Sequence, residues 1–315
     1  MAKLKVAVCA IGIISCTFSS AAIGAFRDIG VGARPLGMGG AFVALADDGS
    51  AANYNAAGLG FIDTNYLNAT LAQRFKGLVN YQYFGGVLPL GGAGTLGASI
   101  GILSEDSEIY TERTFKLSYG KALSRNIAVG LNLKSFGTNF DVTEGFVREL
   151  FADNGTSASA FSADAGIIVK PSEGLSFGLS GENLLPADIS VFDSTDADSV
   201  PVRLRVGLAY SLAGIAESTE QESMRDILRS GLGLAEVEVR NGENFVRAGA
   251  EVWLNQSIAV RAGYGVKNGV GSATTVAIGG SARLAKIIQL DYAFQILTGD
   301  IRDNTTQRIS FNLIF

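Results

Sequence analysis

The feature that most constrains the fold is a series of segments, beginning after residue 62, in which apolar and polar residues alternate. The last segment reads QRISFNLIF and places Ile309, Phe311, Leu313 and Phe315 on one face, opposite Arg308, Ser310 and Asn312. Alternation with a period of two is typical of a β-strand with two unlike faces. The segments are about 9–12 residues long, a length that suits strands crossing a bilayer at a tilt.

Two architectures can carry this alternation. A soluble sandwich buries its apolar faces between two sheets, whereas a transmembrane barrel turns them towards lipid and fills its lumen with polar groups. Long segments, a polar face rich in small residues and paired charges, and the C-terminal aromatic residue Phe315 favour the barrel. We predict an all-β fold, a transmembrane antiparallel β-barrel of about 14 strands with a small N-terminal plug, or hatch, in its lumen. The strands are expected to begin near Asn65, Leu78, Thr95, Thr111, Asn126, Ala158, Gly174, Val202, Leu228, Phe245, Ser257, Thr274, Ile287 and Thr306.

The N-terminus has the pattern of a secretory signal peptide. Lys3 and Lys5 precede the apolar run VAVCAIGII, and the small residues of SSAAIGA follow it as a cleavage zone. Both cysteines, Cys9 and Cys16, lie in this part, so the exported chain has no disulfide framework. An uncleaved anchor and a lipoprotein signal with a lipidated Cys16 stay open as alternatives. The predicted division is a signal peptide over 1–25, a hatch over 26–61 and a barrel over 62–315.

The stretch GARPLGMGGAFVALADDGSAANYNAAGLG, residues 32–60, separates the signal peptide from the first strand. It is too apolar for a flexible linker, and its glycines let backbone pack closely against backbone. A barrel of this size has a wide lumen, which a folded plug would fill. The candidate plug residues are Arg34, Gly37, Gly39, Gly40, Asp47, Asp48, Asn53, Asn55 and Gly58, and the candidate hydrophobic ligand contacts are Phe42, Leu45, Leu59 and Phe61.

These residues resemble the hatch of the PorV/PorQ group within the FadL-like outer-membrane barrels. The resemblance is specific over residues 32–60 and rests on pattern alone over the rest of the chain. It implies a fourteen-stranded barrel with an N-terminal hatch. The hatch of that family usually carries Asn-Pro-Ala before Gly-Leu, whereas this chain has NAAGL, with Ala56 in place of the proline. The rigid turn that proline would give is therefore absent here.

The connections between the predicted strands differ in length. With the C-terminus on the periplasmic side, two long polar loops, 138–157 and 185–199, fall on the outer side, and short turns fall on the inner side, as in outer-membrane barrels. The charged segment 214–226 departs from this rule. It is either an extra periplasmic helix or a sign that strands are miscounted.

Composition excludes several classes of function. The chain has no His, which rules out His-based catalytic triads and His-ligated metals, and we expect no catalytic residue, no metal and no cofactor. A net charge of −5 gives no basic footprint for nucleic acid. The adjacent Asp47 and Asp48 form either a helix start or turn, a carboxylate pair for acid–base chemistry, or a divalent-cation site, and the turn is favoured. GAGTLG, residues 92–97, matches a nucleotide-loop pattern but enters a strand rather than a helix.

Charged residues on the inward strand faces have two interpretations. They are either lumen residues that pair in order to be tolerated, or a track for an anionic group such as a fatty-acid carboxylate. The residues are Lys116, Lys134, Arg203, Arg205, Arg247, Arg261 and Arg308, with Asp164, Glu182, Glu251 and Asp291.

Three functions follow from the resemblance and the pattern, and none is an enzyme. The leading hypothesis is a PorV/PorQ-type component that moves exported proteins or hydrophobic molecules at the outer membrane. Its partners would be outer-membrane lipid, exported cargo or secretion-machine components, and a hydrophobic small molecule. The alternative is a FadL-like uptake channel for long-chain fatty acids or other hydrophobic compounds, and the second alternative is a structural outer-membrane protein. Under the secretion hypothesis the loop residues Phe146, Leu150, Phe151, Val191 and Phe192 would be exposed contacts for cargo, unless they pack onto the barrel rim.

Overall fold

Fourteen strands make up more than half of the residues that the computed structural model describes. These are residues 26, 30–107, 109–142, 149, 151, 155–191, 198–269, 272–299 and 304–315. The predicted signal peptide lies outside these ranges. The strands are β1 (Tyr66–Arg74), β2 (Val79–Pro89), β3 (Thr95–Glu105), β4 (Tyr110–Ala122), β5 (Ile127–Phe140), β6 (Ser157–Ser172), β7 (Leu175–Glu182), β8 (Arg203–Ser211), β9 (Leu232–Arg240), β10 (Glu243–Trp253), β11 (Ile258–Asn268), β12 (Ala273–Leu284), β13 (Ile288–Gly299) and β14 (Asn304–Ile314).

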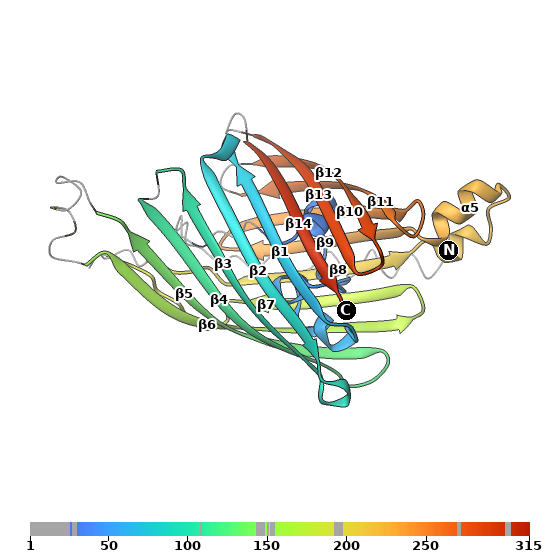
Figure 1. Cartoon of the computed structure of the whole chain (residues 1–315), viewed down its shortest axis with the longest axis horizontal. Helices are drawn as coiled ribbons and strands as arrows, with labels where there is room; N and C mark the ends of the chain where they lie inside the picture. Colours follow the sequence, from blue (N-terminus) through green and yellow to red (C-terminus); the bar gives the residue numbers. More distant parts are fainter. Residues whose placement is uncertain are drawn as a thin grey trace.

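The strands form one closed antiparallel barrel (Figure 1). Each strand pairs with its neighbours in sequence, and β1 closes the ring by pairing with β14, with Tyr66 opposite Ile314. The predicted fold class and strand number are confirmed. The largest error in a predicted strand start is at β9, expected near Leu228 and observed from Leu232, because helix α5 (Glu222–Arg229) occupies the preceding residues.

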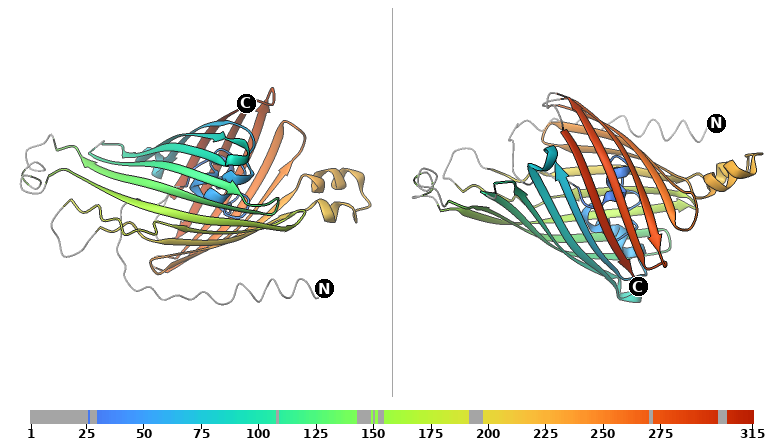
Figure 2. Two further views of the ribbon diagram at one scale, coloured as in Figure 1. Left: turned by 90° about the horizontal axis from the view of Figure 1, so that it is seen from below. Right: turned by 45° about the horizontal axis from the view of Figure 1, so that its top comes forward.

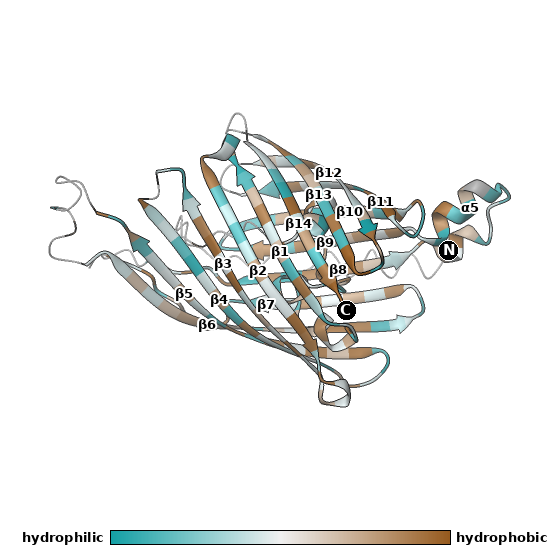
Figure 3. Cartoon of the chain, viewed as in Figure 1, coloured by the Kyte–Doolittle hydropathy of each residue, from teal (hydrophilic) through white to brown (hydrophobic). Residues whose placement is uncertain are grey.

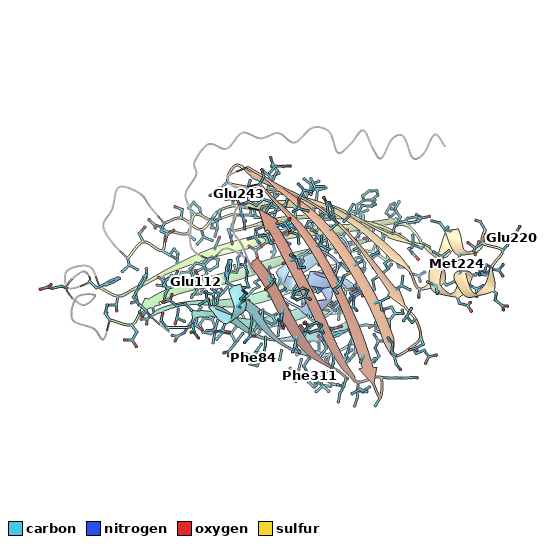
Figure 4. The ribbon with its side chains drawn as sticks, turned by 90° about the horizontal axis from the view of Figure 1, so that it is seen from above. Phe84, Glu112, Glu220, Met224, Glu243 and Phe311 are labelled. Atoms are coloured by element: carbon cyan, nitrogen blue, oxygen red, sulfur yellow. The ribbon has the colours of Figure 1, made fainter. Side chains whose placement is uncertain are left out.

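Apolar and polar residues alternate along the strands (Figure 3), and the apolar ones are exposed on the outside of the barrel whereas the polar ones are buried in the lumen. On β5, Leu133 is 64% exposed, whereas the next residue, Lys134, is 6% exposed. Phe84 and Phe311 stand on the outer surface in the same way (Figure 4). A sandwich would bury these apolar side chains, so their exposure excludes the soluble alternative and matches a barrel whose outer face contacts lipid.

The two ends of the barrel differ. The C-terminus and helices α4 (Ala213–Ala216) and α5 lie at one end, and α5 projects beyond the strands (Figure 1). The long β5–β6 and β7–β8 connections lie at the other end, here called the loop end. The segment 214–226 is largely helical and lies between β8 and β9, so it is an extra helical element and not a sign of miscounted strands. Its periplasmic position stays a prediction. In the described part of the chain, no helix has the length and apolar character to cross a membrane.

The N-terminal segment lies inside the ring of strands (Figure 2). It contains the short helix α2 (Ala33–Gly37) and two 3-10 turns, η1 (Ala51–Asn53) and η2 (Ala56–Phe61). Two further 3-10 turns, η3 (Phe75–Gly77) and η4 (Gly91–Ala93), connect strands. Helix α2 contacts β11–β14, and η2 contacts β3–β6 across the lumen. Among residues 31–59, only Asp47 is exposed. The segment thus spans the lumen between distant parts of the wall, and we refer to residues 31–62 as the lumen segment.

Candidate functional site

Arg34 holds one half of the lumen segment to the wall. Its Nε and NH2 donate to the two carboxylate oxygens of Glu251 on β10, at 2.8 Å each, and its NH1 donates to Asp47 at 2.5 Å and to Asp48 at 3.0 Å. Burial disfavours the charged guanidinium, but Asp47, Glu251 and Asp48 outweigh burial and raise the pKa of Arg34 above its usual value. Arg34 therefore stays charged and ties two parts of the segment to one strand.

The adjacent aspartates have different roles in this cluster. Asp48 accepts hydrogen bonds from the backbone N–H and the hydroxyl of Ser50, at 2.8 and 2.6 Å, which is the turn predicted for DDGS. Asp47 pairs with Arg34 and is partly exposed. Both carboxylates serve the same guanidinium, which is the arrangement of an ion-pair cluster rather than of an acid–base pair.

Asparagine side chains fasten the other half of the lumen segment. Asn55 Nδ2 donates to the carbonyls of Val43 at 3.0 Å, Ile167 at 3.1 Å and Leu179 at 3.3 Å, while its Oδ1 accepts from Ala57 N–H. It therefore joins the segment to β6 and β7 and caps η2.

Asn53 makes a second link between the segment and the wall. Its Oδ1 accepts a hydrogen bond from Lys116 Nζ at 2.8 Å, and its Nδ2 donates to the Tyr83 hydroxyl at 2.9 Å. Both predicted asparagines thus connect the segment to the strands.

Glu236 on β9 is an anchor that the sequence did not reveal. One of its oxygens accepts the backbone N–H groups of Phe42 and Val43, each at 2.9 Å, and the side chain is 2% exposed. Arg247 pairs with the other oxygen at 3.2 Å. A buried carboxylate thus satisfies two backbone donors of a segment that lies 193 residues away in the chain.

Glycines on the wall strands allow the backbone of the lumen segment to pack directly against the backbone of the wall. A Cβ added at Gly263 on β11 would lie 2.0 Å from the nitrogen of Gly39, and one at Gly178 on β7 would lie 2.2 Å from the carbonyl oxygen of Val43. No real side chain could occupy these positions without moving the segment. We call the set of wall glycines whose added Cβ would meet the segment closer than about 3 Å the glycine belt: Gly120, Gly130, Gly166, Gly178, Gly207, Gly249, Gly263 and Gly279.

Some of the glycines predicted in the lumen segment contact the glycine belt from the side of the segment. Gly37 faces Gly279, and Gly39 and Gly40 adopt φ values of +68° and +84°, which favour glycine. Gly58 packs against Ala46 within the segment, where an added Cβ would lie 1.9 Å from the carbonyl oxygen. The belt glycines were missed because a glycine in a strand gives no sign of its partner. The sequence signal for them is their position on the inward faces of the strands, where a glycine leaves room for a segment in the lumen.

The four predicted ligand contacts form part of the core of the segment. Phe42 and Leu59 have no exposed surface, and Leu45 and Phe61 pack against the same core. Phe42 meets Tyr54 edge-on, with ring centroids 5.2 Å apart. Lys170 Nζ lies 3.8 Å from the Phe61 ring centroid. None of these four lines the cavities described next, and their role as ligand contacts stays a prediction.

Cavities lie on both sides of the lumen segment. The cavity at the loop end has a volume of about 390 Å³, and Leu36, Gly39, Gly40 and Tyr54 of the segment form part of its lining. The cavity at the C-terminal end measures about 260 Å³ and is lined by Arg34, Asp47 and Asp48 together with wall residues. A third, of about 90 Å³, lies near Phe26. The segment therefore separates two compartments of the lumen.

The inward charges of the wall lie in the lumen as predicted, and ion pairs join many of them. Lys134 pairs with Asp164 at 2.5 Å, and Arg261 pairs with Glu251 and Asp291. Arg203 and Arg205 both reach Glu182 and Glu238. Lys116 donates to Asn53 and Arg308 donates to the carbonyl of Gly32. Pairing accounts for the presence of most of these charges in a crowded lumen.

The predicted cargo contacts in the long loops are in part contradicted. Phe151 is 9% exposed and its ring lies 5.0 Å from that of Phe140, so it packs onto the rim instead of facing solvent. Val191 is half-buried. Phe146, Leu150 and Phe192 lie outside the described residues. In the second loop, Ile189 packs with Phe26 and Phe136, which also places apolar loop residues against the barrel.

Comparison with known proteins identifies the fold. No protein-family model matches the chain, and no curated protein matches it. Among solved structures, it is similar to the CymD monoaromatic hydrocarbon channel (TM-score 0.63, 11% identity, 92% of this chain and 98% of that chain). It is similar to the P. putida toluene transporter TodX (TM-score 0.64, 11% identity, 91% and 99%). It is also similar to a Pseudomonas aeruginosa FadL homologue (TM-score 0.62, 10% identity, 90% and 97%). The chain has the fold of the FadL-type channels.

Proposed function

We propose that this chain is an outer-membrane channel for small hydrophobic compounds and that the lumen segment is its plug. The observation that carries the proposal is a lumen occupied by residues 31–62, with a cavity on either side. The fold supports it, because structural neighbours over more than 90% of their length are described as hydrocarbon channels and toluene transporters. This is the uptake alternative of the sequence analysis, and it takes precedence over the secretion hypothesis.

The contacts of the plug suggest how it works. Its polar anchors fix one position, whereas the glycine belt gives close packing without interlocking side chains. A segment held in this way can shift along the wall once its anchors exchange partners, and a shift would connect the two cavities. The apolar outer face of the barrel supports a membrane location, and the predicted signal peptide supports export.

A reversible cross-link tests whether the plug must move. A Cβ added at Gly49 of the plug would lie 3.3 Å from the Cβ of Asn68 on β1, close to the separation of about 3.5–4.5 Å found in disulfides. The only cysteines of the chain, Cys9 and Cys16, lie in the predicted signal peptide. We expect the double variant Gly49→Cys/Asn68→Cys to lose toluene uptake when oxidised and to regain it on reduction.

The assay measures uptake of labelled toluene by Gram-negative cells that produce the protein, compared with cells carrying an empty vector. The single variant Gly49→Cys is the matched control and should not respond to oxidant. If cells that produce the protein take up no more toluene than cells with the empty vector, the channel proposal is wrong. Uptake that persists in the oxidised, fully cross-linked protein would keep the channel and remove the moving plug.

Membership of the PorV/PorQ group and a role in protein secretion remain a second proposal. Its support is the sequence of residues 32–60, including Asn55, Gly58 and Leu59. It predicts that an exported protein co-purifies with the barrel and that loops 138–157 and 185–199 are needed for this. Mass spectrometry of the protein extracted from its own outer membrane in mild detergent tests it, since bound apolar compounds without protein cargo would speak against it.

A further inference from the structure

The cavity at the loop end is unusually rich in cationic side chains. Its volume of about 390 Å³ falls in the range of about 300–1,000 Å³ common for small-molecule sites. Among the described residues that line it, none is acidic. The cationic lining residues come from six strands of the wall and are Arg74, Arg205, Arg240, Arg247, Lys267 and Arg308.

Carboxylates that balance this charge lie outside the lining. Arg247 pairs with Glu238 at 2.8 Å, and Lys267 pairs with Glu243 at 2.6 Å. Glu238 and Glu243 are 1% and 5% exposed. Carboxylates held there fix the positions of the cations, and they leave the cavity itself lined by positive groups.

Aromatic rings stand beside the same cations. The guanidinium carbons of Arg240 and Arg247 lie 5.0 and 4.8 Å from the ring centroid of Phe245. The guanidinium of Arg74 lies 5.1 Å from the Phe75 centroid. Phe75 and Phe245 both line the cavity, together with the apolar residues Leu36, Val266 and Leu297. The cavity thus offers cations and apolar surface to the same ligand.

We propose that this cavity binds an aromatic acid, a small ring compound that carries a carboxylate or a similar acidic oxygen group. The oxygens would accept hydrogen bonds from the guanidinium groups, which match a carboxylate in geometry, and the ring would pack on Phe75 and Phe245. This inference rests on the proposed channel function and narrows its substrate class. A neutral hydrocarbon could pack on the rings but would accept no hydrogen bond from these guanidinium groups.

The position of the cavity gives the ligand a second role. Gly39 and Gly40 of the plug line it, and the same two glycines lie against β10 and β11. A bound acid therefore lies against the part of the plug that meets the wall most closely. Arg247 contributes to the cavity and also pairs with Glu236, which accepts the N–H groups of the plug. Binding at the cations would weaken this anchor by competing for Arg247.

The test compares an acid with its neutral analogue. The full-length protein in lipid nanodiscs is dialysed to equilibrium against 2-naphthoate or 2-naphthylmethanol, with empty nanodiscs as the blank. We expect 2-naphthoate to bind at least about tenfold more tightly, and this preference to fall at high salt because it depends on charge. Arg74→Gln should reduce the affinity for 2-naphthoate several-fold and leave that for 2-naphthylmethanol unchanged.

Arg229→Gln is the matched control, because Arg229 lies on the exposed helix α5, paired only loosely with Asp226 at 3.5 Å. This variant removes the same charge outside the lumen and should bind 2-naphthoate as the unaltered protein does. Equal or tighter binding of 2-naphthylmethanol would overturn the acid site and leave the channel in place. Absence of saturable binding of either compound would overturn the acid site as well, and toluene uptake would then decide the channel separately. If Arg74→Gln and Arg229→Gln lower the affinity for 2-naphthoate equally, the effect comes from the net charge of the protein, and the acid site is overturned as well.

Discussion

The lumen segment meets the wall in two different ways. At the charged anchors, side chains such as Arg34 and Glu251 reach between the segment and the strands and bond at defined atoms. At the glycine belt, the two backbones approach each other with no side chain on the wall, as at Gly263 and Gly39. The anchors specify one position, because moving them leaves buried charges without partners. The belt sets only how closely the backbone of the segment approaches the backbone of the wall. The difference teaches that the segment is located by its charges and accommodated by its glycines.

Breaking an anchor should have the largest effect. Glu251 is 1% exposed and bonds both Arg34 and Arg261, so Glu251→Gln leaves two buried guanidinium groups with reduced compensation. We expect the free energy of unfolding to fall by about 3 kcal/mol. Urea titration in lipid vesicles, followed by the fluorescence of the single Trp253, measures it. Asp226→Asn, at an exposed pair, should change it by less than about 0.5 kcal/mol. Equal effects would mean that the anchor does not hold the segment.

Filling a belt position should have an intermediate effect. Gly263→Ala places a methyl group against the backbone of Gly39, and we expect a loss of about 1–3 kcal/mol in the same titration. Gly137→Ala on β5 is the control, because nothing lies within 4 Å of an added Cβ there. The control should be neutral or slightly stabilising, since alanine loses less backbone entropy than glycine on folding. A loss of similar size in both variants would show that the belt is not matched to the segment.

Introducing the proline of the hatch sequence that this chain resembles should have the smallest effect. Asn55 is extended, with φ −159° and ψ 107°, a conformation that a residue before proline prefers, and Ala56 is the first residue of η2. Ala56→Pro should therefore stabilise the protein by about 0.4–1 kcal/mol, by restricting the unfolded chain. A destabilised variant would mean that this turn differs in shape from the one that the resemblance implies.

The sequence predicted the strands well, because a barrel wall with an apolar outer face and a polar lumen imposes its alternation on every strand. The strand number and the inward position of Arg203, Arg205 and Arg308 follow from that rule alone. The rule fails where the chain leaves the sheet, so the start of β9 moved when α5 took its place.

The site was predicted only in part. The composition of residues 32–60 identified the segment, but it did not reveal which wall residues the segment meets. Glu236, for example, lies 194 residues from Phe42, and the belt glycines are spread over many strands. Phe42 and Leu59 lie in the interior of the segment, where a short apolar stretch builds its own core, and their role at a ligand stays a prediction. The secretion hypothesis followed from a local resemblance, whereas the comparison of whole structures shows the fold that the chain shares with the FadL-type channels.

The contacts of helix α2 with β11–β14 have a consequence for assembly. Helix α2 is synthesised before most of the barrel, yet the surface on which it docks, β11–β14, is synthesised last. The lumen segment cannot complete its contacts until the final strands have arrived, at the time when β1 meets β14 and the ring closes. Docking of the segment would then mark completion of the barrel. A barrel that stops assembling before closure would leave the glycine belt uncovered, and its exposed backbone could contact other polypeptide chains.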